Sequence, residues 1–269
     1  MEAMFLTIDI GNSHIVIGAY PHPAPADPKA RMAEQPLATW RLQTDRLRTG
    51  DEYRLLLRQL WEEKGYRPGL FQATGIVSVV APLTDIWVPL LTDLLGQPPL
   101  VIRAGLEVGL TLALRRPEVV GADRLVDAVA AYRRFGGPVI AVDFGTATTF
   151  NVVTRDGRFL GGAIAPGLGT VTNALIERAS ALPAVELTPP PSAIGSDTVP
   201  AIQSGLVYGY VGLVEGLLSR LQAELGEPAQ VVATGGLGHI VAPLTDAIHQ
   251  YDPWLTLAGV REVYLMNRG

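Results

Sequence analysis

The sequence predicts an α/β protein of two domains whose sheets are partly parallel. An internal duplication is the first observation, because residues 4–18 and 137–153 each form two short apolar, β-rich runs joined by a polar turn. Further strand-like runs then alternate with helix-like stretches, which is typical of sheets with parallel pairs. A length of 269 residues with 48% hydrophobic side chains is sufficient for two modest cores.

The polar turns of the two copies share an Asp-x-Gly pattern at the end of the first strand, with Gly11 in one copy and Gly145 in the other. Glycine allows a positive φ and lets main-chain amides approach an anion. Side-chain donors near the glycines are Asn12, Ser13, Thr146 and Thr148. Each copy taken singly fits equally well a hairpin that uses these residues for turn chemistry alone. Two copies in one chain favour a pair of phosphate-binding turns.

Asp9 and Asp143 stand at the strand ends before these turns. Their carboxylates would lie beside the bound phosphates, an arrangement that is repulsive unless a cation lies between them. The pattern therefore implies a bound metal ion.

After the first hairpin, residues 20–29 are proline-rich and predict an exposed turn or insertion, because proline cannot continue a hydrogen-bonded strand ladder. Residues 36–44 alternate well enough for a third strand. Thr49 and Glu52 then form a capping-box pattern before a helix over residues 53–64.

Residues 73–80 are a β-branched run of the kind that is buried on both faces, and Pro82 opens a second helix through Leu95. The next predicted strand covers residues 99–103. A short extended piece is expected around residues 109–112.

The second half begins with a helix over residues 125–134, and Asp123 lies at or near its N-terminus. The pattern alone favours a helix-capping role for Asp123. After the second hairpin we expect a third strand over residues 159–164 and a helix over residues 170–181.

Pro200 marks the first turn of a long helix that runs to about Leu225. This helix carries a face of small residues, formed by Gly205, Gly209, Gly212 and Gly216. The smooth face fits core packing better than a subunit interface. Residues 230–238 predict a strand that enters a diglycine turn, and this turn is a candidate binding site for an adenine ring or a ribose.

Composition excludes several functional classes. A net charge of −5 without a cluster of basic and aromatic residues gives no support for binding nucleic acid or an anionic membrane. The absence of cysteine excludes disulfides, a thiol nucleophile and Cys-ligated zinc. The four histidines lack His-Glu-x-x-His spacing, and the chain has neither a P-loop nor a Rossmann fingerprint. No run approaches the ~20 apolar residues of a membrane span, so we expect a cytoplasmic protein.

Seven short motifs in order resemble those of type III pantothenate kinases, within the acetate and sugar kinase, heat-shock ATPase and actin superfamily. They lie at residues 9–16, 121–124, 143–147, 161–167, 194–198, 203–209 and 234–236. The resemblance implies two ribonuclease-H-like domains, over residues 1–117 and 118–269, with mixed sheets flanked by helices. It also implies ATP-dependent phosphorylation of pantothenate, the first step of coenzyme A biosynthesis, in a homodimer that requires K⁺ or NH₄⁺ as well as Mg²⁺.

Site residues are carried over by position in these motifs. The first phosphate-binding turn would comprise Asp9, Ile10, Gly11, Asn12, Ser13, His14, Ile15 and Val16, and Thr146 would contact an ATP phosphate. The potassium ligand would be Asp143. Pantothenate would contact Gly121, Ala122, Asp123, Arg124 and Thr198, the last either in its own subunit or from a partner subunit. The resemblance makes Asp123 the general base, and this replaces the capping interpretation.

The chain departs from the family pattern at several positions. Ser13 replaces the usual Thr, Asp197 replaces the usual Asn, and Leu114 stands where many members have a substrate-contacting Tyr. The alternatives are another small-molecule kinase of the superfamily and a non-catalytic regulator derived from it. The first should lack the Gly-Ala-Asp-Arg helix start, and the second should have lost Asp123 or Asp143.

Overall fold

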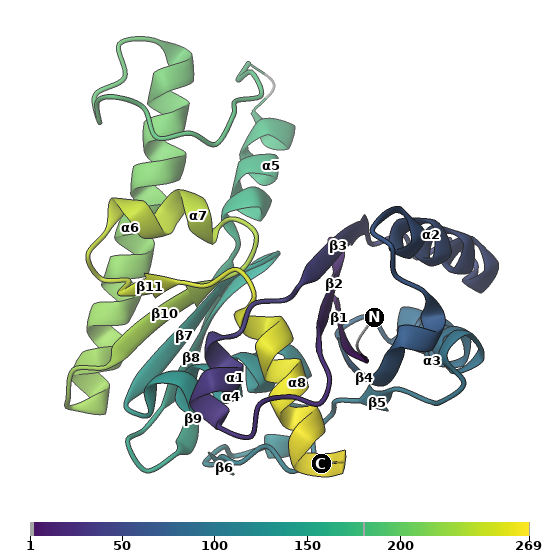
Figure 1. The fold of residues 1–269 in the computed structure, drawn as a ribbon. Coiled ribbons are helices and arrows are strands. Elements are labelled where there is room, and N and C mark those ends of the chain that lie inside the picture. The colour runs from purple at the N-terminus through teal and green to yellow at the C-terminus, as the bar shows by residue number, and fades with distance from the viewer. Residues whose placement is uncertain (1–2, 180, 269) are drawn as a thin grey trace. The chain divides into compact units, whose positions relative to one another are not determined.

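The computed structural model describes residues 3–179 and 181–268, which form two mixed sheets flanked by helices (Figure 1). The strands are β1 (Met4–Ile10), β2 (His14–Pro21), β3 (Ala38–Gln43), β4 (Phe71–Ser78), β5 (Leu100–Val101), β6 (Thr111–Leu112), β7 (Val139–Phe144), β8 (Ala147–Val153), β9 (Arg158–Pro166), β10 (Gln230–Thr234) and β11 (Gln250–Tyr251). The α-helices are α1 (Pro28–Ala33), α2 (Gly50–Glu63), α3 (Ala81–Leu95), α4 (Ala122–Phe135), α5 (Leu168–Arg178), α6 (Thr198–Leu225), α7 (Gly238–Val241) and α8 (Leu255–Arg268). Short 3-10 helices cover Pro68–Leu70, Pro117–Val119 and Ala242–Leu244.

The strand order of the two sheets repeats. The first sheet runs β3-β2-β1-β4-β5, and the second contains the equivalent series β9-β8-β7-β10-β11, with β6 added beside β9. In both series the first three strands are antiparallel and the later ones join in parallel. This repetition confirms the predicted α/β class and the internal duplication.

Two compact units divide the chain at places other than residue 117. Unit 1 comprises Met1–Leu110, Arg115–Arg134 and Trp254–Gly269, and unit 2 comprises Thr111–Leu114 and Phe135–Pro253. Almost all of α4, and all of α8, therefore pack with unit 1, although the sequence boundary placed both helices in the C-terminal domain. In α8, Leu257 packs with Phe5 of β1, and Gly259 lets the α8 backbone lie against Val126 of α4.

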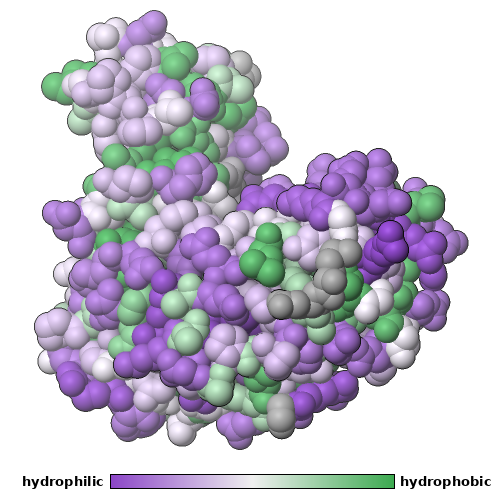
Figure 2. All heavy atoms as spheres, in the orientation of Figure 1, coloured by the Kyte–Doolittle hydropathy of each residue, from purple (hydrophilic) through white to green (hydrophobic). Residues whose placement is uncertain are grey.

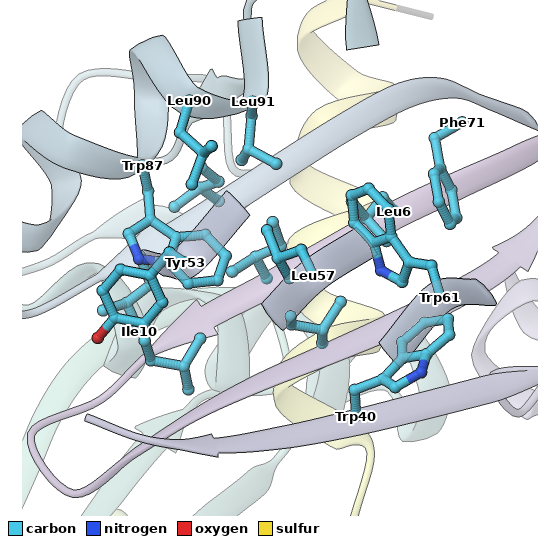
Figure 3. Packing of buried hydrophobic residues seen from close by; sticks show 14 of the residues in the cluster. Leu6, Ile10, Trp40, Tyr53, Leu57, Trp61, Phe71, Trp87, Leu90 and Leu91 are labelled. Carbon is cyan, nitrogen blue, oxygen red and sulfur yellow. The ribbon is translucent and has the colours of Figure 1, made fainter. Parts of the chain in front are cut away.

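The core of unit 1 is rich in aromatic side chains. Trp61 and Trp87 are fully buried from α2 and α3, and Tyr53 packs beside Trp87 with a ring-centroid separation of 5.1 Å (Figure 3). Helix α2 begins with the predicted capping box, in which Thr49 Oγ1 accepts from Glu52 N and Glu52 Oε2 accepts from Thr49 N. The capping box predicted from the sequence therefore marks the start of α2, the helix that contributes Tyr53 and Trp61 to this core.

The proline-rich insertion is more ordered than an exposed turn. It runs into α1, whose Met32 is buried, and two ion pairs link residues 31–34 to α8 within unit 1. Arg31 pairs with the buried Glu262, and Arg261 Nη1 lies 2.6 Å from Glu34 Oε2. The guanidinium of Arg261 also lies 4.2 Å from the ring centroid of Tyr20. Residues 21–29 are exposed or partly exposed, as predicted, but the segment after them was not expected to be ordered, because its charged partners are distant in sequence.

Helix α6 packs one face on the sheet of unit 2. Its buried residues include Ile202, Tyr210 and Val214, which join the cluster around Val142 and Phe150.

By length and composition this helix could span a membrane, so the expectation that no segment approaches that criterion was wrong. The core helix of a soluble protein passes the same test, which makes this weak support for a membrane span.

Candidate active site

The first Asp-x-Gly turn is a tight hairpin in unit 1. Gly11 N donates to His14 O over 3.0 Å, and Thr44 Oγ1 donates to Gly11 O over 2.7 Å. Asn12 and Ser13 are exposed at the tip of the turn. Ile10 and Ile15, by contrast, are completely buried, so only their main chain could contact a ligand.

Positive charge surrounds this first turn. Arg46 Nη2 donates to Asn12 Oδ1 over 2.9 Å and fixes the orientation of that amide. Burial lowers the pKa of His14, and the Arg41 guanidinium lowers it further. The His14 ring is therefore neutral near pH 7, and the two arginines supply the local charge that would suit an anion.

Asp123 lies in the first turn of α4, but it is not the residue that caps the helix. Gly121 O accepts from Leu125 N over 3.2 Å, which places Gly121 at the capping position. Asp123 Oδ1 instead accepts from Arg124 N over 2.9 Å. A Cβ at Gly121 would overlap Asp123 Oδ1, so glycine at this position leaves room for the carboxylate.

Helix α4 holds Asp123 on a rigid base. Leu125 and Val126 are fully buried, and the buried Asp127 accepts from Thr256 Oγ1 of α8 over 2.7 Å. Burial lowers the pKa of Arg124, while the charges of Asp123 and Asp127 oppose that effect. Asp123 itself is only partly buried and thus accessible to a substrate hydroxyl.

In unit 2, the second Asp-x-Gly turn is fixed by the glycine-rich turn that follows β9. Thr146 O accepts from Gly167 N over 3.0 Å and from Thr170 Oγ1 over 2.7 Å. A Cβ at Gly167 would overlap Gly145 O, so glycine allows this close approach. Thr146 remains exposed and can contact a ligand.

The diglycine turn after β10 lies directly against Asp143. Thr234 pairs with Asp143 in the parallel register, and Gly235 follows with φ +88°. A Cβ at Gly235 would overlap Asp143 Oδ1 and would lie 2.5 Å from Phe144 N. Tyr251 Oη donates to Gly235 O over 3.0 Å and holds the turn in place. The structure thus brings together two motifs that are about ninety residues apart in the sequence.

Comparison with known proteins identifies the family. A family model described as type III pantothenate kinase matches residues 5–220. This chain belongs to the type III pantothenate kinase family. It is 46% identical over 264 residues to a type III pantothenate kinase of Moorella thermoacetica, which covers 98% of this chain and all of that protein. The same name is given to a Myxococcus xanthus protein that is 44% identical, with 98% of this chain and 99% of that protein covered.

Solved structures with low sequence identity share the fold. A Campylobacter jejuni protein described as a conserved putative Baf family transcriptional activator has a TM-score of 0.58 and 19% identity, with 98% of each chain covered. A ROK family glucokinase from Streptomyces griseus has a TM-score of 0.53 and 14% identity, and covers 98% of this chain and 99% of its own. These likenesses agree with the duplicated, ribonuclease-H-like architecture that the family resemblance implied.

The departure at residue 197 keeps the helix-capping role that the usual Asn could also fill in this type III pantothenate kinase. Asp197 is the N-cap of α6, and its Oδ1 accepts from Thr198 N over 2.6 Å. Thr198 is the first residue of the helix and is exposed. The aspartate therefore stabilises the helix start and orients the residue beside it.

Two expectations about unit 2 are wrong. Thr148 is fully buried, and its hydroxyl lies 2.6 Å from Tyr210 Oη, so it is not an outward donor of the phosphate turn. The glycines of α6 do not serve core packing, because a Cβ at Gly205, Gly209 or Gly212 would meet no atom of the described residues within 4 Å. The core face of α6 consists of its large apolar residues instead.

Sequence reasoning also missed Arg46, Tyr251 and Tyr210, which support the turns through contacts distant in sequence.

Within residues 3–179 and 181–268, no cluster of three or more acidic or histidine side chains could hold a metal ion. A cation site here would rely on a single carboxylate, main-chain oxygens and the ligand itself.

Proposed function

We propose that this chain transfers the γ-phosphoryl group of ATP to pantothenate and forms 4′-phosphopantothenate, the first step of coenzyme A biosynthesis. The observation that carries the proposal is full-length similarity to type III pantothenate kinases. It is supported by the position of Asp123 in the first turn of α4, where the absence of a side chain at Gly121 leaves space for the Asp123 carboxylate. The glycine at position 121 leaves the carboxylate room beside the helix terminus, where an anion is favoured.

The proposed catalytic base is Asp123. Its carboxylate would accept the proton of the primary hydroxyl of pantothenate while the hydroxyl oxygen bonds to the γ-phosphorus. The bond from that phosphorus to the oxygen shared with the β-phosphate then breaks, and ADP leaves. Asp123 suits this role because it is partly exposed and fixed by Arg124 N.

We assign ATP phosphates to the two Asp-x-Gly turns, at residues 9–16 and Thr146, with Ile10 and Ile15 offering only their main chain. The exposed Asn12 and Ser13 can donate to phosphate oxygens in the first turn. Arg46 would add positive charge beside them. Because Arg46 Nη2 donates to Asn12 Oδ1, the amide nitrogen of Asn12 points away from Arg46 and can donate to a phosphate.

Asp143 is the proposed ligand of a monovalent cation. The site fits such an ion, because Asp143 is a partly exposed carboxylate and glycine at position 235 keeps the space beside Oδ1 clear of a side chain. Bound there, K⁺ or NH₄⁺ would offset the repulsion between this carboxylate and the phosphates, while Mg²⁺ would bind to the nucleotide.

Pantothenate is assigned to residues 121–124 and to Thr198. Arg124 is the cation closest in sequence to Asp123 and is suited to pair with the pantothenate carboxylate. Leu114 lies beside Gly161 in unit 2 and offers no hydroxyl to the substrate. We expect the departures from the family pattern at Leu114 and Asp197 to change the affinity for pantothenate and to leave the rate of phosphoryl transfer unchanged.

A coupled assay tests this proposal directly. Purified protein with ATP, Mg²⁺, K⁺ and pantothenate should release ADP, and the phosphorylated product should be found by mass spectrometry. Glucose and acetate serve as alternative acceptors in parallel reactions. Turnover of one of these in place of pantothenate would indicate another kinase of the superfamily, and no turnover of any acceptor would indicate a non-catalytic relative.

The proposed assembly is a homodimer that uses α6. Gly205, Gly209 and Gly212 form an exposed face on this helix, and a groove of about 520 Å³ next to it is lined in part by Leu175 and Leu206. Figure 2 shows apolar surface around the ends of α5 and α6, where Ile194 is 86% exposed. An apolar surface beside a smooth helix face is suited to a second copy of the chain.

Replacing Gly209 with arginine should give a monomer with reduced activity. The new side chain has open space in the single chain and a better helix propensity than glycine, so folding should be preserved while a partner helix is excluded. Light scattering measures the mass. Gly69→Arg is the control, because a Cβ at Gly69 also meets no described atom within 4 Å. A dimeric Gly209→Arg protein, or a fully active monomer, would contradict this assembly.

The remaining assignments follow the expectations from sequence. We propose a cytoplasmic enzyme whose partners are ATP, pantothenate and a second copy of itself. The net charge of −5 supports neither nucleic acid nor an anionic membrane as a partner.

A further inference from the structure

We propose that Tyr210 is a positioning residue for nucleotide binding: its hydroxyl ties helix α6 to β8, the strand that follows the second Asp-x-Gly turn, and to the end of the neighbouring strand β9. Tyr210 is buried, and its Oη lies 2.6 Å from Thr148 Oγ1 and 2.9 Å from Pro166 O. Thr148 is at the start of β8, just after the turn, and Pro166 is the last residue of β9. This inference rests on the proposed ATP-binding role of the turn.

The direction of the two hydrogen bonds is fixed by chemistry. Pro166 O can only accept, so the single hydroxyl proton of Tyr210 is donated to it. Thr148 Oγ1 must then donate to Tyr210 Oη. Burial raises the pKa of Tyr210, and hydrogen bonds with Thr148 and with the Leu168 backbone oppose this effect, so the phenol keeps its proton at neutral pH. Tyr210 therefore supplies a partner to both the Thr148 hydroxyl and the Pro166 carbonyl.

A short path leads from Tyr210 to the phosphate-contacting residue. Pro166 is followed by Gly167, whose N donates to Thr146 O over 3.0 Å. Thr148 is two residues after Thr146 on the other side. Tyr210 thus fixes both flanks of Thr146 although it does not approach the proposed ligand. Loss of its hydroxyl leaves Thr148 Oγ1 and Pro166 O without this partner, and local rearrangement to satisfy them would move the turn.

Removal of the hydroxyl by Tyr210→Phe should weaken ATP binding about tenfold, in line with the loss of a buried hydrogen-bond partner. ATP binding is measured by calorimetry, and KM for ATP, KM for pantothenate and kcat by the coupled assay. KM for ATP should rise and KM for pantothenate should stay within about twofold. Thr148→Val should have the same effect, and the double variant should be no worse than either single one, because all three remove one network.

Tyr208→Phe is the matched control on the same helix. Tyr208 Oη donates to Pro190 O over 2.6 Å, away from the turn, so its loss should lower the melting temperature without changing ATP affinity. If Tyr210→Phe lowers the melting temperature as Tyr208→Phe does and leaves ATP affinity unchanged, Tyr210 is only structural and the inference is overturned. Wild-type protein that binds ATP but does not phosphorylate pantothenate would overturn the proposed reaction alone, since calorimetry still tests Tyr210. Wild-type protein that binds no ATP would overturn both.

Discussion

Replacing Asp123 with asparagine is expected to lower kcat by about 10²–10⁴ and to leave ATP affinity nearly unchanged. The substitution removes the proton acceptor but preserves the size of the side chain and an oxygen that can accept from Arg124 N. Initial rates at saturating ATP and pantothenate measure the first effect. Calorimetry with ATP measures the second.

Asp51→Asn provides a matched control, because Asp51 is also the second residue of a helix and is exposed on α2. It shares the interaction of Asp123 with a helix N-terminus but lies outside the proposed site. Its rate should equal that of the wild type. Gly121→Ala should also lose activity, because the new Cβ would displace the Asp123 carboxylate. Near-normal turnover by Asp123→Asn would reduce Asp123 to a structural role.

Activity is expected to require K⁺ or NH₄⁺ and to be poor in Na⁺ alone, even when Mg²⁺ is saturating. Two anions about 4 Å apart repel by ~4 kcal/mol at an effective dielectric near 20, which corresponds to about 10³-fold in binding. Asp143 and a bound phosphate would face this penalty without a cation between them. Na⁺ is smaller and holds its water more tightly, so it should fill a pocket sized for K⁺ poorly.

The measurement compares initial rates in the chloride salts of K⁺, NH₄⁺ and Na⁺ at constant ionic strength. Asp143→Ala is tested in the same salts and should lose most of its activity together with its preference for K⁺. Asp156→Ala, in the exposed turn between β8 and β9, is the control for general loss of a carboxylate in unit 2. Equal rates in Na⁺ and K⁺, or a fully active Asp143→Ala protein, would make Asp143 a turn residue.

Much of the fold could be predicted from local signals. The capping box at Thr49, the glycine after Leu95 and the two Asp-x-Gly hairpins correctly predicted α2, α3 and the central strands. Helix α8 was not predicted, because its buried residues include Arg261 and Glu262 and therefore show no one-sided apolar pattern. Its burial depends on partners such as Glu34 and Arg31, which only the folded chain brings near.

In the candidate site, too, local sequence signals could be predicted and contacts between distant residues could not. The motif residues could be named from sequence, because each lies beside a turn glycine or a helix start. The packing of Gly235 against Asp143 and the use of Thr148 by Tyr210 could not be predicted, since they depend on strand register and helix packing. Thr148 looked like a ligand donor in the sequence, but β8 is buried on both faces from Thr148 onward, and the Thr148 hydroxyl is used by Tyr210 of α6.

Unit 1 is built from both ends of the chain, and this has a consequence for how the protein is made. Trp254 leaves the ribosome 144 positions after Leu110, a delay on the order of ten seconds at typical synthesis rates. Until then Phe5, Tyr20 and Ala73 lack the cover of Leu257. Unit 2 is complete by Pro253. The large core cluster between Met4 and Leu91 can form early, but the side chains that α8 covers stay exposed until the last helix of the chain is synthesised.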